Sequence, residues 1–100
     1  MSISEFLKNN IDILSTRIIG SFNHTFDSHD FIEKFAEIFE SEYIDSLNQY
    51  KGKGAFQTVH SQIGRFLRDN ENILHIKGIG KAENKNIFGN IDGIEKWEKI

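Results

Sequence analysis

The sequence of 100 residues contains no cysteine and no proline, and each absence narrows the possibilities. Without cysteine the chain has no disulfide, no thiolate nucleophile and no cysteine ligand for zinc. The lack of proline favours uninterrupted helices, because proline removes a helical hydrogen bond. No apolar run approaches the ~20 residues needed to cross a bilayer, so we expect no membrane partner. The N-terminus has no signal-peptide pattern, which predicts a cytoplasmic protein.

What is present is the composition of a globular protein, with 38% hydrophobic and 27% charged residues. A chain of this length forms one domain and buries roughly 60–70% of its unfolded surface. No internal repeat or low-complexity tract divides it. We therefore expect residues 1–100 to form a single domain around one core.

The net charge of −3 is unevenly distributed. Residues 1–50 carry three Lys or Arg against nine Asp or Glu, a net charge of −6. Residues 51–100 carry nine against six, a net charge of +3. This asymmetry suggests an acidic and a basic surface with different partners. Chance clustering of charge in a short chain is the competing explanation.

Apolar residues recur at steps of three and four over residues 3–19, which predicts one continuous helix. Ser2 and Glu5 fit a capping box at its start, and Gly20 fits a left-handed stop. The apolar stripe of this helix is broad enough to need cover. We expect a second copy of the chain to supply that cover, so residues 3–19 predict a homodimer.

Polar residues 21–28 predict a loop, in which Asp27 and Ser28 are candidate caps for a helix that begins near Asp30. The apolar pattern of that helix changes phase near Ser41. One bent helix or two separate helices would explain the change, and we favour two, with Ser41 as a cap.

The two glycines in Lys51–Gly54 end this helical region, and the next helix is predicted over 58–70. Its inward face is apolar and consists of Val59, Ile63, Phe66 and Leu67. Its opposite face contains no acid and consists of Thr58, Ser61, Arg65 and Arg68. Gly64 lies beside that face, where we expect it to pack tightly against another helix, the alternative being close approach of a ligand.

After Asn70 the pattern changes from helical to strand-like. Residues 73–80 alternate polar and apolar side chains, and residues 86–90 fit a short return strand, so that 73–90 predicts a β-hairpin. In the tail, apolar residues three apart fit a helical turn or a strand. In both cases we expect Trp97 to cover the core.

The predicted order of elements over residues 30–90 resembles that of a small bacterial winged helix-turn-helix domain. Helices 41–50 and 58–70 would be the helix-turn-helix, and the hairpin 73–90, with its Lys77–Lys81 segment, would be the wing. The fold class is therefore expected to be mainly α with a C-terminal β-hairpin, with a winged-helix-like core over 30–100. The link 51–57 is longer than the usual tight turn, and a short strand near Phe56 and Gln57 would explain its length.

This resemblance implies a DNA-binding protein whose last helix enters the major groove of double-stranded DNA while basic residues of the wing contact phosphate or the minor groove. Arginines on such a helix suit guanine or phosphate, and lysines supply contacts that do not depend on sequence. The expected nucleic-acid-binding residues are Thr58, Ser61, Arg65, Arg68, Lys77, Lys81 and Lys85. The alternative is a protein–protein interaction module that binds no nucleic acid, which the negative net charge favours.

Catalytic and metal sites are not expected. His24, Asp27, His29 and Asp30 lie close together in sequence, but their spacing fits no standard metal motif, and helix capping explains the two acids better. His60 flanks the apolar face of its helix and is expected to be a packed or capping histidine rather than a general base. The sequence contains no nucleophile-elbow, phosphate-loop or dinucleotide-binding motif, so we expect no enzyme and no cofactor.

Overall fold

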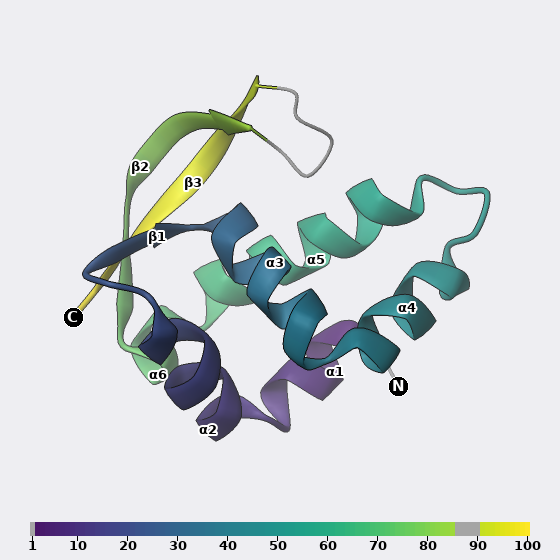
Figure 1. Ribbon diagram of the computed structural model, residues 1–100, viewed down its shortest axis with the longest axis horizontal. Coiled ribbons are helices and arrows are strands. Elements are labelled where there is room, and N and C mark those ends of the chain that lie inside the picture. Colours follow the sequence, from purple (N-terminus) through teal and green to yellow (C-terminus); the bar gives the residue numbers. More distant parts are fainter. Residues whose placement is uncertain (1, 86–90) are drawn as a thin grey trace.

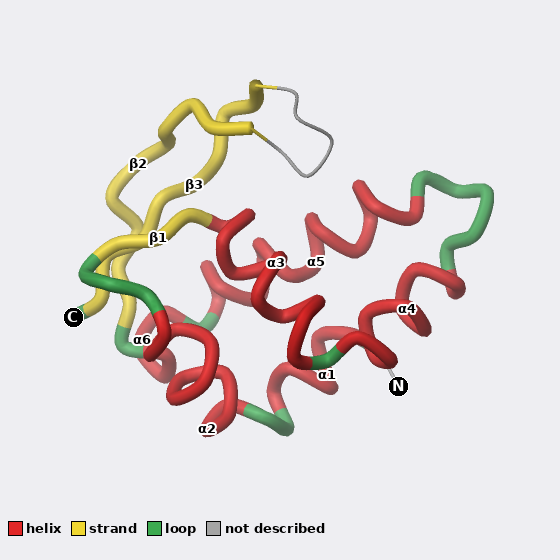
Figure 2. The backbone as a smooth tube through the Cα atoms, viewed as in Figure 1, coloured by secondary structure: helices red, strands yellow, loops and turns green. Residues whose placement is uncertain are grey.

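A computed structural model describes residues 2–85 and 91–100 of the chain. Helices are followed by a long β-hairpin that completes a small antiparallel sheet (Figures 1 and 2). The helical elements are α1 (Ile3–Lys8), α2 (Ile11–Ile13), a π-helical turn (Leu14–Ile18), a 3-10 turn (Ile19–Ser21), α3 (Ser28–Ile38), α4 (Glu40–Gln49), α5 (Ala55–Asp69) and α6 (Glu71–Leu74). The strands are β1 (Thr25–Asp27), β2 (Ile76–Lys85) and β3 (Ile91–Lys99). This mainly helical α+β arrangement is compatible with the predicted winged-helix-like fold.

The N-terminal helical segment is not the single helix that its apolar stripe predicted. It breaks at Asn9 and Asn10, where the Asn10 side chain donates to the carbonyl of Phe6 at 2.7 Å. Asparagine side chains compete with the backbone for such bonds, which explains the break. Ser2 caps the helix as predicted, because the backbone amide of Glu5 donates to Ser2 Oγ, which is one of the two bonds of the predicted capping box. Gly20 is not left-handed, so the prediction of a left-handed stop was wrong.

The apolar stripe of residues 3–21 is covered by the chain itself. Ile3, Leu7 and Ile18 are all at most 3% exposed and belong to the same core cluster as Val59 and Leu67 of α5. This segment was predicted to lie outside the winged-helix-like core, yet it contributes directly to it. The homodimer was predicted because the stripe needed cover, and that reason was wrong; the homodimer itself stays a prediction.

The middle of the chain forms two separate helices, α3 and α4, as favoured over one bent helix. Asp27 caps α3 through a reciprocal capping box with Asp30, as expected for one of the two candidate caps. The break before α4 falls at Phe39, whose backbone is not helical, so Ser41 is not a cap. Two left-handed glycines end the link before α5, which begins at Ala55 rather than residue 58. The predicted strand near residues 56 and 57 is therefore replaced by the first turn of α5.

The inward face predicted for α5 is confirmed, since its four apolar residues are all buried. After α5 the chain forms a short extra helix, α6, where a strand was predicted to begin. His75 then adopts a left-handed conformation with φ 55°, and this turn delays the start of β2 to Ile76.

The hairpin is longer than predicted. Residues 81–85, which lie between the two predicted strands, belong to β2, and β3 is the strand that returns. The return strand predicted over 86–90 lies outside the described residues. For the tail, a helical turn and a strand were the two alternatives, and the structure shows a strand, β3. Trp97 is buried in it, as expected.

Strand β3 is the centre of the sheet, because the strand order is β1-β3-β2 and both neighbours are antiparallel to it. The register between β2 and β3 shifts between Gly78 and Lys81, and Gly80 in this bulge has φ 107°. Bulges bend a strand. The outer half of the hairpin accordingly curves back toward α3 and α5 (Figure 1).

Trp97 connects this sheet to the helices. The indole is fully buried, and its Nε1 donates to Ser28 Oγ at 3.0 Å at the start of α3. Opposite it in the ladder lies Gly78, where an added Cβ would already be 3.5 Å from the indole. A methyl group at this position would therefore be in ordinary van der Waals contact with the indole, so Gly78 and Trp97 are closely packed neighbours.

Replacing Trp97 by Phe should lower the free energy of unfolding by about 1–3 kcal/mol, because it leaves a cavity and removes the bond to Ser28. Urea unfolding followed by circular dichroism measures the change. Ile100 is 82% exposed, and its replacement by Ala serves as a control that should stay within about 0.5 kcal/mol. A Phe variant as stable as the original protein would contradict the importance given to Trp97.

Candidate nucleic-acid interface

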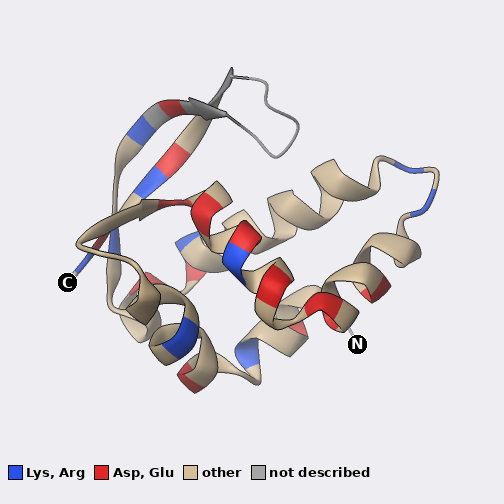
Figure 3. Cartoon of the chain, viewed as in Figure 1, with Lys and Arg blue, Asp and Glu red and all other residues tan. Residues whose placement is uncertain are grey.

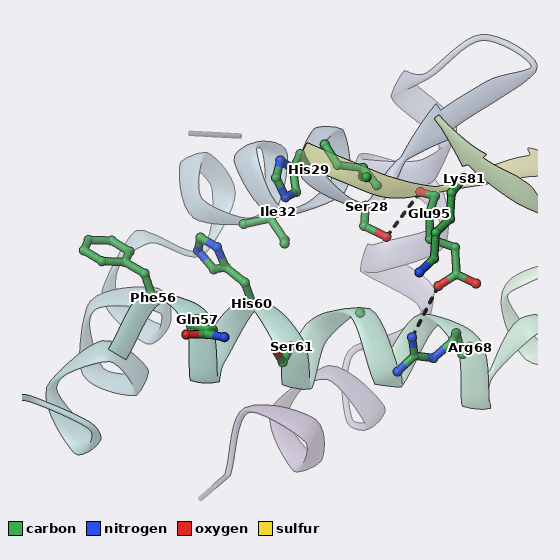
Figure 4. Close-up of a pocket in the computed structure, with 13 residues that line it drawn as sticks. Ser28, His29, Ile32, Phe56, Gln57, His60, Ser61, Arg68, Lys81 and Glu95 are labelled. Carbon is green, nitrogen blue, oxygen red and sulfur yellow. Dashed lines mark hydrogen bonds and ion pairs between the residues drawn. The ribbon is translucent and has the colours of Figure 1, made fainter. Parts of the chain in front are cut away.

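The candidate site is a cleft of about 480 Å3 between α3, α5 and the hairpin. The first turn of α3 forms one wall, the outward side of α5 forms the floor, and Lys81 with residues 93–95 forms the other wall. Polar and apolar side chains both line it. Phe56 lies at one end, while Arg68, Lys81 and Glu95 gather at the other (Figure 4).

Four residues of α5 that face this cleft share one side of the helix, since they are spaced three or four positions apart. This α5 row consists of Gln57, Ser61, Gly64 and Arg68. It contains no acid. It presents an amide, a hydroxyl and a guanidinium group, all of which donate hydrogen bonds.

Gly64 is the gap in the α5 row. A glycine inside a helix costs about 1 kcal/mol relative to alanine. Close packing within the chain was the expected reason for it, and that expectation was wrong. A Cβ built at Gly64 would find no described heavy atom within 4 Å, so it opens onto free space.

Arg68 is paired with an acid that the helix pattern did not show. Its Nη1 lies 3.5 Å from Oε2 of Glu95 on β3, and the two side chains are 54% and 24% exposed. Lys81 is the residue opposite Glu95 in the β2–β3 ladder. Two cations therefore flank one carboxylate, and the basic end of the cleft carries one net positive charge from these three groups.

The structure brings together three of the seven predicted site residues and separates the rest. Ser61, Arg68 and Lys81 line the cleft. Thr58 is half-buried and donates to the carbonyl of Lys53 at 3.5 Å. Arg65 lines a different hollow, between α1 and the end of α5.

The two remaining predicted residues lie on the hairpin. Lys77 pairs in register with Glu98, next to the Gly78–Trp97 pair that faces the core. Because side chains alternate along a strand, Lys77 projects from the opposite face of the sheet and away from the cleft. Lys85 is the last residue of β2, and its side chain lies outside the described part of the structure.

Charge is partly segregated in space. Acidic residues follow α3 and α4 and the loop before α5 is basic, whereas the hairpin carries both acidic and basic residues (Figure 3). Lys51 and Lys53 are both exposed in that loop. Within the cleft, the cations are Arg68 and Lys81 at one end, where Glu95 also lies.

His60 of α5 lines the cleft and is neutral. Its Nε2 lies 2.7 Å from the hydroxyl of Tyr43 on α4, and the two rings stack. Burial, and secondarily the charge of His29 on α3, lowers the pKa of His60 from 6.5 to about 4. Burial also raises the pKa of Tyr43. This contact links α4 to α5 and matches the packing role expected of His60.

The residues once considered for a metal site have separate structural roles. Asp27 and Asp30 form the cap of α3, and His24 is within 3.1 Å of Glu98. His29 lines the cleft, and its buried Nδ1 has no hydrogen-bond partner among the described residues. Within 2–85 and 91–100, no three His, Asp or Glu side chains gather where they could hold a metal ion.

Two site residues were missed from the sequence, for different reasons. Gln57 belongs to the α5 row, but the helix was predicted to begin one residue later. If Gly54, whose backbone is left-handed, had been taken as the residue before the helix, the predicted helix would have included Gln57. Glu95 comes from a strand that is distant in sequence, and no local pattern connects it to Arg68.

Comparisons of the chain with protein-family models, with curated proteins and with solved structures gave no match. Within the described residues, no helix is long and apolar enough to span a membrane. A function for this chain is therefore argued from the fold and from the side chains of the cleft.

Because His60 is neutral in the folded chain, the free energy of unfolding depends on pH. As the pH falls, the unfolded chain, in which the pKa of His60 is near 6.5, takes up a proton before the folded chain does, and this favours unfolding. The contribution of neutral His60 to the free energy of unfolding is therefore fully present above about pH 6.5 and is lost between about pH 6.5 and pH 4. His60→Gln should reduce the acid-induced loss by on the order of 1 kcal/mol, since partial exposure weakens the effect.

Urea unfolding of both proteins at about pH 7 and about pH 4.5 tests this, because other titrating groups contribute equally to the two. An equal loss of stability in both proteins would show that His60 does not carry this pH dependence.

Proposed function

We propose that this chain binds double-stranded DNA through the α5 row and the hairpin. The proposal depends on the α5 row, which contains no acid and ends at Arg68, and on Lys81, which faces the row across the cleft. A helix beside a lysine-bearing hairpin is the arrangement by which winged-helix domains meet a duplex. The fold supports the proposal by analogy with winged-helix domains, and the hydrogen-bond donors of the α5 row support it because they can bind phosphate and base edges.

The side chains of the row suit both parts of a DNA target. Arginine forms two parallel hydrogen bonds with guanine or with phosphate, and glutamine does so with adenine. A serine hydroxyl donates to backbone oxygens. Lys81 meets phosphate as a point charge and adds affinity without choosing a sequence.

The acidic helices also favour one orientation. The acids on α3 and α4 repel a duplex, whereas the lysines in the loop before α5 attract it (Figure 3). A polyanion is therefore attracted to that loop and to the end of the cleft with Arg68 and Lys81. The net charge of −3 keeps the total attraction small, so we expect weak binding at physiological salt.

The alternative function is protein–protein interaction at the same cleft. Its support is the apolar lining from Ile32 and Phe56, together with Glu95, which neutralises part of the positive charge. Such a lining suits a peptide better than a phosphate backbone. A short duplex that fails to bind at low salt would favour this alternative.

Replacing Arg68 by Ala should weaken binding of a labelled duplex by about 5- to 100-fold, the effect expected when one bidentate contact is lost. Fluorescence anisotropy at low salt measures the affinity. Arg17, an exposed arginine in the N-terminal π-helical turn, is the matched control, and its replacement by Ala should have little effect. Equal losses for both variants would indicate that only total charge matters.

Replacing Lys81 by Ala tests the contribution of the hairpin to phosphate binding. If Lys81 neutralises one phosphate, the slope of log affinity against log salt should become shallower by about 0.9. The loss should be similar for duplexes of different sequence, since a phosphate contact carries no base information. An unchanged slope would place Lys81 outside the interface.

A further inference from the structure

Gly64 has no explanation within the described part of the chain. Its backbone is helical and not left-handed, so any residue fits that conformation. No described atom would contact a Cβ there, so packing does not require a glycine either. A glycine that weakens a helix without a reason among the described residues points to a group beyond them that approaches the helix backbone closely.

The free space over Gly64 is bordered by hydrogen-bond donors. Ser61 lies one turn before it on the same side of α5, and Arg68 lies one turn after it. Lys81 faces them across the cleft. A group with several oxygen acceptors and a negative charge complements this border, and a bulky apolar group does not.

We propose, on the basis of the DNA-binding function above, that one phosphodiester of the duplex lies over Gly64 and replaces Glu95 as the ion-pair partner of Arg68. The cleft of about 480 Å3 has the size of a small-ligand site, so it receives a segment of one strand rather than the duplex width. The missing side chain lets that segment contact the backbone of α5.

The pair between Arg68 and Glu95 is suited to exchange. Its atoms are 3.5 Å apart and both side chains are partly exposed, and such pairs are weak in water. Phosphate offers Arg68 a charge-assisted and bidentate partner instead. Glu95 therefore competes with the duplex for Arg68 and lowers its affinity.

Two substitutions at Gly64 test the contact with the backbone. Gly64→Ala should raise the melting temperature, because alanine favours the helix, and yet weaken duplex binding. Gly64→Leu should fill the space and weaken binding about tenfold or more, the loss of a charge-assisted contact. Ser41→Leu places the same bulk on an exposed position of α4 and is the control that should bind as the original protein does.

A third substitution tests the competition by Glu95. Glu95→Gln should strengthen duplex binding by about two- to fivefold, since an exposed ion pair has a small energy. The same change in an Arg68→Ala protein should give a clearly smaller gain, because only Lys81 remains to be released and only the repulsion between Glu95 and phosphate is removed. A labelled duplex followed by anisotropy at low salt serves for every variant, and thermal unfolding confirms that each variant is folded.

The outcomes separate this proposal from the function on which it depends. If the original protein does not bind the duplex at low salt, DNA binding itself fails, and an acidic peptide becomes the next probe for the cleft. If the protein binds but tolerates leucine at Gly64, the duplex does not approach α5 there. If Glu95→Gln weakens binding, Glu95 holds the hairpin in place and does not compete with phosphate.

Discussion

The buried contact between Trp97 and Ser28 is the interaction on which the rest of the structure depends. It joins two residues that are 69 positions apart, one in the central strand and one in the first turn of α3. The Ser28 hydroxyl also lies 3.5 Å from the carbonyl of Glu95, so the same turn of α3 contacts β3 twice. A buried indole N–H needs such a partner, because an unpaired donor is costly in an apolar core.

This contact also sets the geometry of the cleft. Ser28 belongs to one wall and Glu95 to the other, so the bond to Trp97 fixes the distance between the walls at their base. The capping box of Asp27 and Asp30 holds the first turn of α3 in the conformation that this contact requires. The bulge at Gly80 then bends the outer half of the hairpin over the floor formed by α5.

Features that depend on local chemistry could be predicted from the sequence. The cap at Asp27, the break at Lys51–Gly54 and the inward face of α5 all follow from residues close together in the chain. Features that depend on distant partners could not. Strand β1 has only three residues, too few to show alternation, and it exists because β3 pairs with it. The same limit hid Glu95, which meets Arg68 across 27 positions.

The order of the strands in space has a consequence for the synthesis of the protein. Strands β1 and β2 do not pair with each other in the described sheet, and each is bonded to β3, which follows every other element along the chain. On the ribosome, both outer strands emerge before the strand that joins them. The sheet therefore forms only after β3 has emerged. The pairing of β1 with β3 joins segments far apart in the chain and so has a larger entropy cost of loop closure than the hairpin of β2 and β3.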